Sequence, residues 1–149
     1  MKREILKSIA LLMLTLALAA VTAQAQSANQ MKADIPFRFV IGNQTLPAGE
    51  YTIRYVNQDS GKTALLFKSR DGRTSRIVNM MTTQRSEPAE MTSIVFNQYG
   101  ESYFLSEVWT SASSYGLALP KSSAERRLKD GDLAQNSARR VTVALIAGR

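Results

Sequence analysis

The chain of 149 residues contains no cysteine and no histidine. Without cysteine the protein can form no disulfide and can carry no lipid on a cleavage-site cysteine, so its fold must rest on an apolar core. Ser-His-Asp hydrolases, cysteine peptidases, histidine acid–base enzymes and nearly all zinc sites each lose an essential residue type. These absences favour a protein that is not an enzyme and that holds no cofactor and no metal.

Other chemical patterns are missing as well. The Asp130-Gly131-Asp132 stretch lacks the further ligands of a helix-loop-helix calcium site, and the chain has no glycine-rich phosphate loop. Lysine-assisted serine catalysis and paired-carboxylate glycoside hydrolysis stay compatible with the composition. For hydrolysis the clustered carboxylates are Glu101 with Glu107 and Glu87 with Glu90. Pairs at such spacings are usually ordinary surface carboxylates.

The first 25 residues have the organisation of a secretory signal peptide. A basic region, about a dozen apolar residues and a small-x-small cleavage pattern follow one another: Lys2, Arg3 and Lys7, then residues 9–20, then Ala23-Gln24-Ala25. The apolar run is shorter than the roughly 20 residues of a membrane-spanning helix. We therefore expect residues 1–25 to be a cleaved signal peptide, residues 26–149 to form a single β-domain, and the mature chain to have no transmembrane span.

Export defines the expected location and partners of this protein. The location is periplasmic or extracellular, and the sequence leaves both open. Removal of residues 1–25 leaves 16 basic and 11 acidic residues, a balance of +5. The expected partner is a protein or an envelope polymer, with at most a weak polyanion contact because the charges are scattered along the chain. An exported address argues against nucleic acid.

Residues 33–55 carry the clearest structural pattern. Apolar and polar residues alternate in two runs, and glycine and proline separate the runs at residues 42–43 and 46–49. The apolar positions are Ala33, Ile35, Phe37, Phe39 and Ile41, then Tyr51, Ile53 and Tyr55. This period of two predicts a pair of half-buried strands that form an opening hairpin.

A second hairpin is expected around Asp71-Gly72. This dipeptide between two extended runs is typical of a two-residue type I′ turn, which needs positive φ at both central positions. Such a turn places Leu65 opposite Val78 and Leu66 opposite Ile77.

The remaining elements follow from turn and capping residues. A polar connection at residues 84–90 is expected to divide the strands into two groups, and residues 91–99 are expected to pair with 102–110. Ser122 and Glu125 fit a capping box at the start of one short helix. A last strand is expected at 141–147. The predicted fold is all-β, an antiparallel meander of six to eight strands that forms a small β-barrel or a two-sheet β-sandwich, with the short helix before the last strand.

The strand at 102–110 contains the candidate ligand-binding residues Glu107, Trp109 and Tyr103. By the alternation of a strand these three share one face with Leu105. If that face is the core, Glu107 needs a partner, for which arginine is the obvious type. If it is the rim of a pocket, Glu107 could contact a ligand.

Three motifs occur in order along the mature chain: Ile35-Pro36-Phe37-x-Phe39, Leu46-Pro47-Ala48-Gly49-x-Tyr51, and Leu119-Pro120-Lys121-Ser122-x-Ala124-Glu125-Arg126. With them the chain resembles a family of small secreted β-rich proteins of soil acidobacteria. The resemblance implies export and a β-rich single domain. It brings no catalytic or ligand residues, because none are established for that family.

Three functions agree with these observations. The first is an exported non-enzymatic β-domain that acts as a binding or cell-envelope interaction module. The alternative is a carrier of small apolar ligands with an aromatic-lined β-barrel interior, although aromatic residues at alternating strand positions usually fill a core. The second alternative is a carboxylate-dependent polysaccharide hydrolase.

Overall fold

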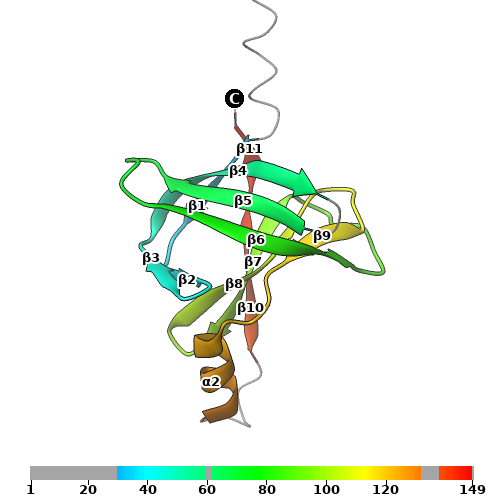
Figure 1. The fold of residues 1–149 in the computed structure, drawn as a ribbon. Helices are drawn as coiled ribbons and strands as arrows, with labels where there is room; N and C mark the ends of the chain where they lie inside the picture. Colours follow the sequence, from blue (N-terminus) through cyan, green and yellow to red (C-terminus); the bar gives the residue numbers. More distant parts are fainter. Residues whose placement is uncertain (1–29, 60–61, 132–137, 149) are drawn as a thin grey trace, which may run out of the picture. The chain divides into compact units, whose positions relative to one another are not determined.

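The computed structural model describes residues 30–59, 62–131 and 138–148, which form an all-β domain with one helix in the described part (Figure 1). The strands are β1 (Gln30–Ile35), β2 (Phe39–Ile41), β3 (Gln44–Leu46), β4 (Gly49–Asp59), β5 (Lys62–Ser69), β6 (Ser75–Gln84), β7 (Ser93–Tyr99), β8 (Ser102–Trp109), β9 (Tyr115–Ala118), β10 (Arg139–Ala144) and β11 (Ile146–Ala147), and the helix is α2 (Ser123–Gly131). The predicted signal peptide lies outside the described residues. No helix of the described part is long and apolar enough to cross a membrane.

All eleven strands belong to one open sheet with the order β10-β7-β8-β9-β6-β5-β4-β1-β11, to which β2 and β3 are attached through β8. Every pairing of named strands is antiparallel except that of β2 with β8. The all-β class is therefore confirmed. The predictions of six to eight strands, of purely antiparallel pairing, and of a closed barrel or two separate sheets are wrong.

Turn residues divide the first predicted strand into β1 and β2 and add the short strand β3 before β4. Pro36 lacks an amide hydrogen and stands between β1 and β2. Gly42, with a φ of +62°, turns β2 into β3, and Pro47 follows the end of β3. Strand β9, which the sequence did not predict, pairs with both β6 and β8. It joins the two expected strand groups into one sheet.

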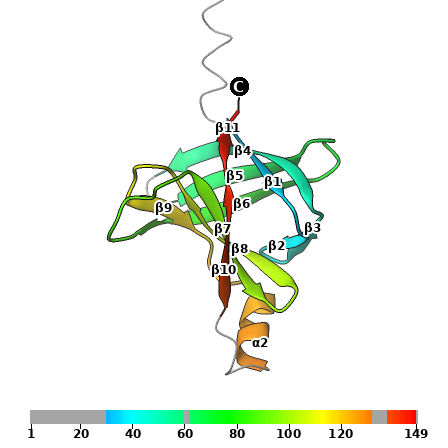
Figure 2. The same ribbon diagram turned by 180° about the vertical axis from the view of Figure 1, so that it is seen from behind.

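The C-terminal segment meets both ends of the sheet. Only Leu145 separates β10 from β11, although these strands stand at opposite ends of the order. The amide of Leu145 donates to the carbonyl of Thr92 (2.9 Å) beside β7, whereas the amide of Gly148 donates to Gln30 (2.8 Å) on β1. Figure 2 shows β10 and β11 following one another between β7 and β1. The sheet therefore curls without closing into a barrel.

The inner face of the curled sheet carries the main hydrophobic core. The predicted alternation of residues 33–55 is confirmed: Ala33, Ile35, Phe39, Ile41, Tyr51 and Ile53 are buried, and Phe37 and Tyr55 are half-buried against them. The ring of Phe39 makes edge-to-face contacts with Tyr51 (5.2 Å between centroids) and Phe96 (5.4 Å). Aromatic rings thus fill this interior by packing against one another.

The β5–β6 hairpin has the predicted register but not the predicted turn. Leu65 lies opposite Val78 and Leu66 opposite Ile77. In an antiparallel hairpin the position of the turn determines which residues lie opposite one another. The confirmed register therefore shows that the predicted position of the turn is right.

The turn itself is a wider loop. Gly72 takes a φ of +72° but Asp71 does not take a positive φ, which excludes type I′. The carboxylate of Asp71 instead accepts hydrogen bonds from the hydroxyl of Ser69 (2.6 Å) and the amide of Arg73 (3.1 Å). These two bonds lower the pKa of Asp71 and stabilise the wider loop.

Helix α2 begins after Ser122 as predicted, but among the described residues only one of the two hydrogen bonds of a capping box forms. The hydroxyl of Ser122 accepts a hydrogen bond from the amide of Glu125 (3.1 Å). The Glu125 carboxylate, only 3% exposed, accepts from the Asn97 amide (2.8 Å) and the Tyr99 hydroxyl (3.3 Å), both on β7. Glu125 therefore fastens the helix to the sheet.

Candidate functional site: a groove on the outer face of the sheet

A β-bulge in β8 determines which side chains reach the outer face of the sheet. Val95 of β7 lies opposite Glu107, and the next residue, Phe96, lies opposite Leu105. Ser106 is therefore the extra residue between the two pairs. An extra residue reverses the inward and outward alternation of the rest of the strand.

The bulge separates the three predicted site residues. Before it, Leu105 is in the core and Tyr103 packs against the core, stacked on Phe37 at 3.9 Å between centroids. After it, Val108 takes the core position, and Glu107 and Trp109 face outward. The prediction that Tyr103, Leu105, Glu107 and Trp109 share one face is wrong, because the bulge at Ser106 separates the first two residues from the last two.

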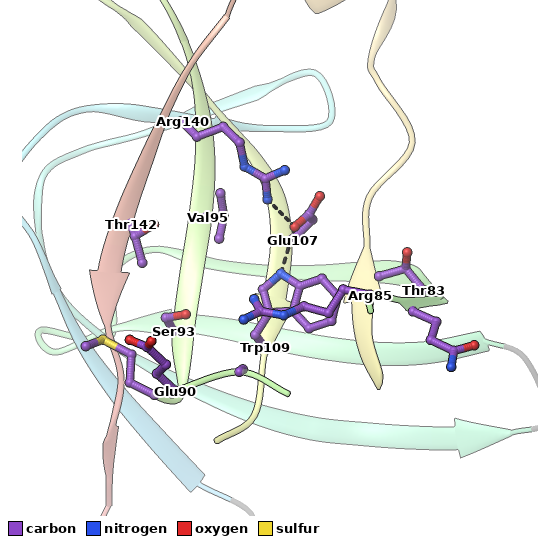
Figure 3. A pocket seen from close by; sticks show the side chains of 12 residues that line it. Thr83, Arg85, Glu90, Ser93, Val95, Glu107, Trp109, Arg140 and Thr142 are labelled. Carbon is purple, nitrogen blue, oxygen red and sulfur yellow. Dashed lines mark hydrogen bonds and ion pairs between the residues drawn. The ribbon is translucent and has the colours of Figure 1, made fainter. Parts of the chain in front are cut away.

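A groove of about 590 Å³ lies on this outer face and includes Glu107 and Trp109 but not Tyr103 (Figure 3). Strands β6, β7, β8 and β10 and the loop that follows β6 supply its walls: Thr83, Gln84, Arg85, Ala89, Glu90, Met91, Ser93, Val95, Glu107, Trp109, Arg140 and Thr142. The groove is open to solvent and lies outside the aromatic core.

Glu107 connects the two sides of the groove. Its Oε2 atom accepts a hydrogen bond from Nε1 of Trp109 (2.7 Å) and forms an ion pair with Nη2 of Arg140, both drawn as dashed lines in Figure 3. The Glu107 side chain is 19% exposed and that of Arg140 is 57% exposed. An arginine partner was expected only if the face of Glu107 were the core, and Glu107 has this partner on the outer face instead. The carboxylate is charge-compensated and fixes the orientation of the indole.

Trp109 belongs to a small outer cluster with Ala89 and Val95. A Cβ atom at position 116 would lie 2.5 Å from Cε3 of Trp109, so only glycine lets the ring pack directly on the backbone of β9. The guanidinium carbon of Arg85 lies 4.9 Å from the centre of the ring, within cation–π distance. These contacts leave Trp109 only 4% exposed.

Arg85 also holds the loop that borders the groove. Its Nε donates to the carbonyl of Glu87 (2.7 Å) and its Nη2 to that of Pro88 (3.2 Å). Further along, the amide of Ala89 donates to Ser113 (2.9 Å), which ties the loop to the segment between β8 and β9. One arginine therefore both covers the indole and shapes the wall.

The groove is polar and its charges balance. Two carboxylates, Glu90 and Glu107, stand with two guanidinium groups, Arg85 and Arg140, and the hydroxyl groups come from Thr83, Ser93 and Thr142. In the described part of the chain, no group of three or more acidic residues could hold a metal ion. Such a lining suits a neutral ligand with many hydrogen-bonding groups.

Two of the groove residues, and the glycine on which Trp109 packs, escaped the sequence prediction. Arg85 lies in a segment interpreted as a polar connection, Gly116 in one interpreted as a loop, and Arg140 just before the predicted last strand. The alternation of Arg140 and Thr142 with buried-type valines could have placed both on the outer face. The approach of Arg85 to Trp109 depends on a loop conformation and has no local pattern.

Comparison of the chain with protein-family models, with curated proteins and with solved structures found no match. The function is therefore inferred from the chemistry of the groove.

Proposed function

We propose that this protein is an exported, non-enzymatic binding module and that the groove binds a cell-envelope polymer. The observation that carries the proposal is the Arg140–Glu107–Trp109 network at an open groove. A sheet face needs no ion pair for stability, because apolar residues of similar volume are often as good or better. A network that fixes an indole and two charged groups around a groove is better explained by ligand recognition.

The lining favours a glycan strand as the ligand. A volume of about 590 Å³ is within the usual range for sites that bind small ligands or short polymer segments. Balanced charge disfavours strongly anionic and strongly cationic ligands. Hydroxyl, amide, carboxylate and guanidinium groups can together bind the hydroxyl groups of a sugar chain.

Export is part of the proposal and rests on residues 1–25. The resemblance to small secreted β-rich proteins of soil acidobacteria points in the same direction. Mass spectrometry of the exported protein should find an N-terminus near Gln26. A full-length chain retained in the cell would contradict export without affecting the groove.

Binding can be tested by NMR titration of the labelled protein with soluble envelope oligosaccharides. We expect shifts of the Trp109 indole resonance and of amides around the groove. In the variant Thr142→Tyr, a larger side chain enters the groove without touching the ion pair, and binding should fall at least tenfold. The control Thr45→Tyr changes an exposed threonine on β3, distant in sequence and absent from the groove lining, and should bind as the unmodified protein does.

Two results would contradict the proposal. The first is the absence of shifts with every oligosaccharide tested. The second is equal loss of binding in the Thr142→Tyr and Thr45→Tyr variants, because the groove would then not be the binding site.

One observation favours a second candidate, a carboxylate-dependent polysaccharide hydrolase: Glu90 and Glu107 line the same groove. In that function one of these two carboxyl groups would serve as the acid and the other as the nucleophile or base. Release of reducing sugar that is abolished in both Glu90→Gln and Glu107→Gln would favour the hydrolase over the binding module. The carrier of apolar ligands stays a prediction, and the mutual packing of the core aromatics gives it no support.

A further inference from the structure

A second surface lies on the outer face of β11, β1, β4, β5 and β6. Strand register places residues in two rows across these strands: Ile146, Lys32, Thr52, Lys68 and Ser75 form one, and Gln30, Arg54, Leu66 and Ile77 form the other. Residues paired across antiparallel strands point to the same face. The neighbouring positions Ala33, Ile53, Phe67 and Val78 are in the core, so both rows point outward. We call the set Lys32, Arg54, Leu66, Lys68, Ile77 and Ile146 the basic face.

The cations of the basic face have no partner among the residues that the structure describes. Lys32, Arg54 and Lys68 are exposed, and no hydrogen bond or ion pair to any of them occurs within the described part of the chain. Neighbouring strands are about 4.8 Å apart, so the backbones at Lys32 and Lys68 are about 10 Å apart. In the adjoining row Arg70 neutralises Glu50 (2.6 Å). Asp34 is the remaining acid of that row, so positive charge predominates.

Exposed aliphatic side chains lie beside these cations. Ile77 is 54% exposed and Ile146 is 72% exposed, and Leu66 between Arg54 and Ile77 is half-buried. The groove differs in both respects, because Glu107 and Arg140 form an ion pair there and its indole is covered. The basic face thus combines free cations with free apolar groups.

We propose that the basic face docks on a membrane surface rich in anionic lipid headgroups. Lysine and arginine attract the negative surface potential, and aliphatic side chains enter the boundary between headgroups and acyl chains. A soluble polyanion would use the cations but leave Ile77 and Ile146 in water. A single-stranded nucleic acid would need aromatic side chains for base stacking, and the two rows contain none. Docking would hold the protein at the envelope while the groove stays free.

The test measures sedimentation with vesicles of phosphatidylcholine containing about 30% phosphatidylglycerol, and with pure phosphatidylcholine. The protein is purified from the exported fraction and its N-terminus is verified, so that residues 9–20 do not bind the vesicles themselves. We expect binding to the anionic vesicles at low salt, little binding to pure phosphatidylcholine, and loss of binding at high salt.

Matched variants separate this surface from overall charge. Arg54→Glu with Lys68→Glu should weaken binding at least tenfold, since each cation near an anionic surface contributes about fivefold. The control Arg126→Glu with Arg127→Glu makes the same change of net charge on α2 and should bind within about threefold of the unmodified protein. Ile77→Ser should weaken binding severalfold at unchanged charge. Thermal unfolding identifies any misfolded variant, and Arg54→Gln with Lys68→Gln then replaces the glutamate pair.

Three outcomes would overturn the proposal. These are no binding to anionic vesicles at low salt, equal weakening in the test and control pairs, and unchanged binding of Ile77→Ser together with equal affinity for soluble dextran sulfate. The last outcome would identify a polyanion site instead of a lipid surface. None of these outcomes bears on glycan binding in the groove, so the two proposals fail separately.

Discussion

The two apolar clusters lie on opposite faces of β7 and depend on different kinds of contact. Ile94 and Phe96 point into the main core, where large side chains with no exposed surface pack on one another. Val95 points outward to the outer cluster, in which Trp109 is held by one glycine, one carboxylate and one guanidinium group. The core is stabilised by the total area buried, whereas the outer cluster depends on a few particular atoms. Single substitutions should therefore have different effects on the two faces.

Phe39→Ala should produce the largest effect. Phe39 is fully buried between Tyr51 and Phe96, and its truncation should lower the free energy of unfolding by about 3 to 5 kcal/mol. Chemical denaturation measures this change. The control Val40→Ala, at a half-buried neighbouring position, should cost clearly less. Equal costs would show that the inner face does not form the stabilising core.

Gly116→Ala should have the next largest effect and should act on the outer cluster. The new Cβ would lie 2.5 Å from the Trp109 ring, so the ring or strand β9 must shift, at a cost of about 1 to 3 kcal/mol. Because Trp109 is the single tryptophan, its fluorescence emission should move toward longer wavelength.

Gly100→Ala is the control for that substitution. No atom lies within 4 Å of a Cβ at this position, but its φ is +58°. We expect some loss of stability from backbone strain and unchanged Trp109 emission. A shift of the emission in Gly100→Ala, or none in Gly116→Ala, would contradict the direct packing of the indole on β9.

The same contrast explains what the sequence could predict. Alternation in residues 33–55 and the turn at Asp71-Gly72 predicted the buried positions and the β5–β6 register, because period and turn position are local properties. The cap of Ser122 on Glu125 was predicted for the same reason. The buried positions and the hairpin register on the core side can therefore be predicted largely from the sequence.

The outer face was less predictable because it depends on irregularities and on distant contacts. The bulge at Ser106 reverses the faces of β8 and leaves no mark in the hydrophobic pattern. Strand β9 has only four residues and exists because β6 and β8 both pair with it. The sequence left open whether Glu107 meets an arginine or a ligand, and the contact with Arg140 depends on the pairing of β10 with β7. Local sequence patterns contain none of this information.

Glu107→Ala should have an intermediate effect, because it leaves Nε1 of Trp109 without its acceptor and Arg140 without its ion pair. We expect a loss of about 1 to 2 kcal/mol in the free energy of unfolding. Glu107→Gln keeps an acceptor for the indole and should lose about half as much. Glu101→Ala, an exposed carboxylate in the β7–β8 turn, is the matched control and should be close to neutral. A neutral Glu107→Ala would show that the network does not stabilise the fold.

Arg85→Ala should have the smallest effect on stability and the clearest effect on access to the indole. The cation–π contact is worth about 1 kcal/mol or less at an exposed site, so the unfolding transition should change little. Its guanidinium covers a ring that is 4% exposed and donates to two loop carbonyls, so quenching of Trp109 fluorescence by acrylamide should increase severalfold. Arg85→Lys keeps the charge but loses the planar guanidinium group. Its quenching should lie between that of the unmodified protein and that of Arg85→Ala. Arg139→Ala, an exposed arginine beside the ion-paired Arg140, should leave quenching unchanged. If Arg85→Ala also leaves the quenching unchanged, Arg85 does not cover the indole. Packing alone would then shield Trp109 from solvent, as it shields the side chains of the core.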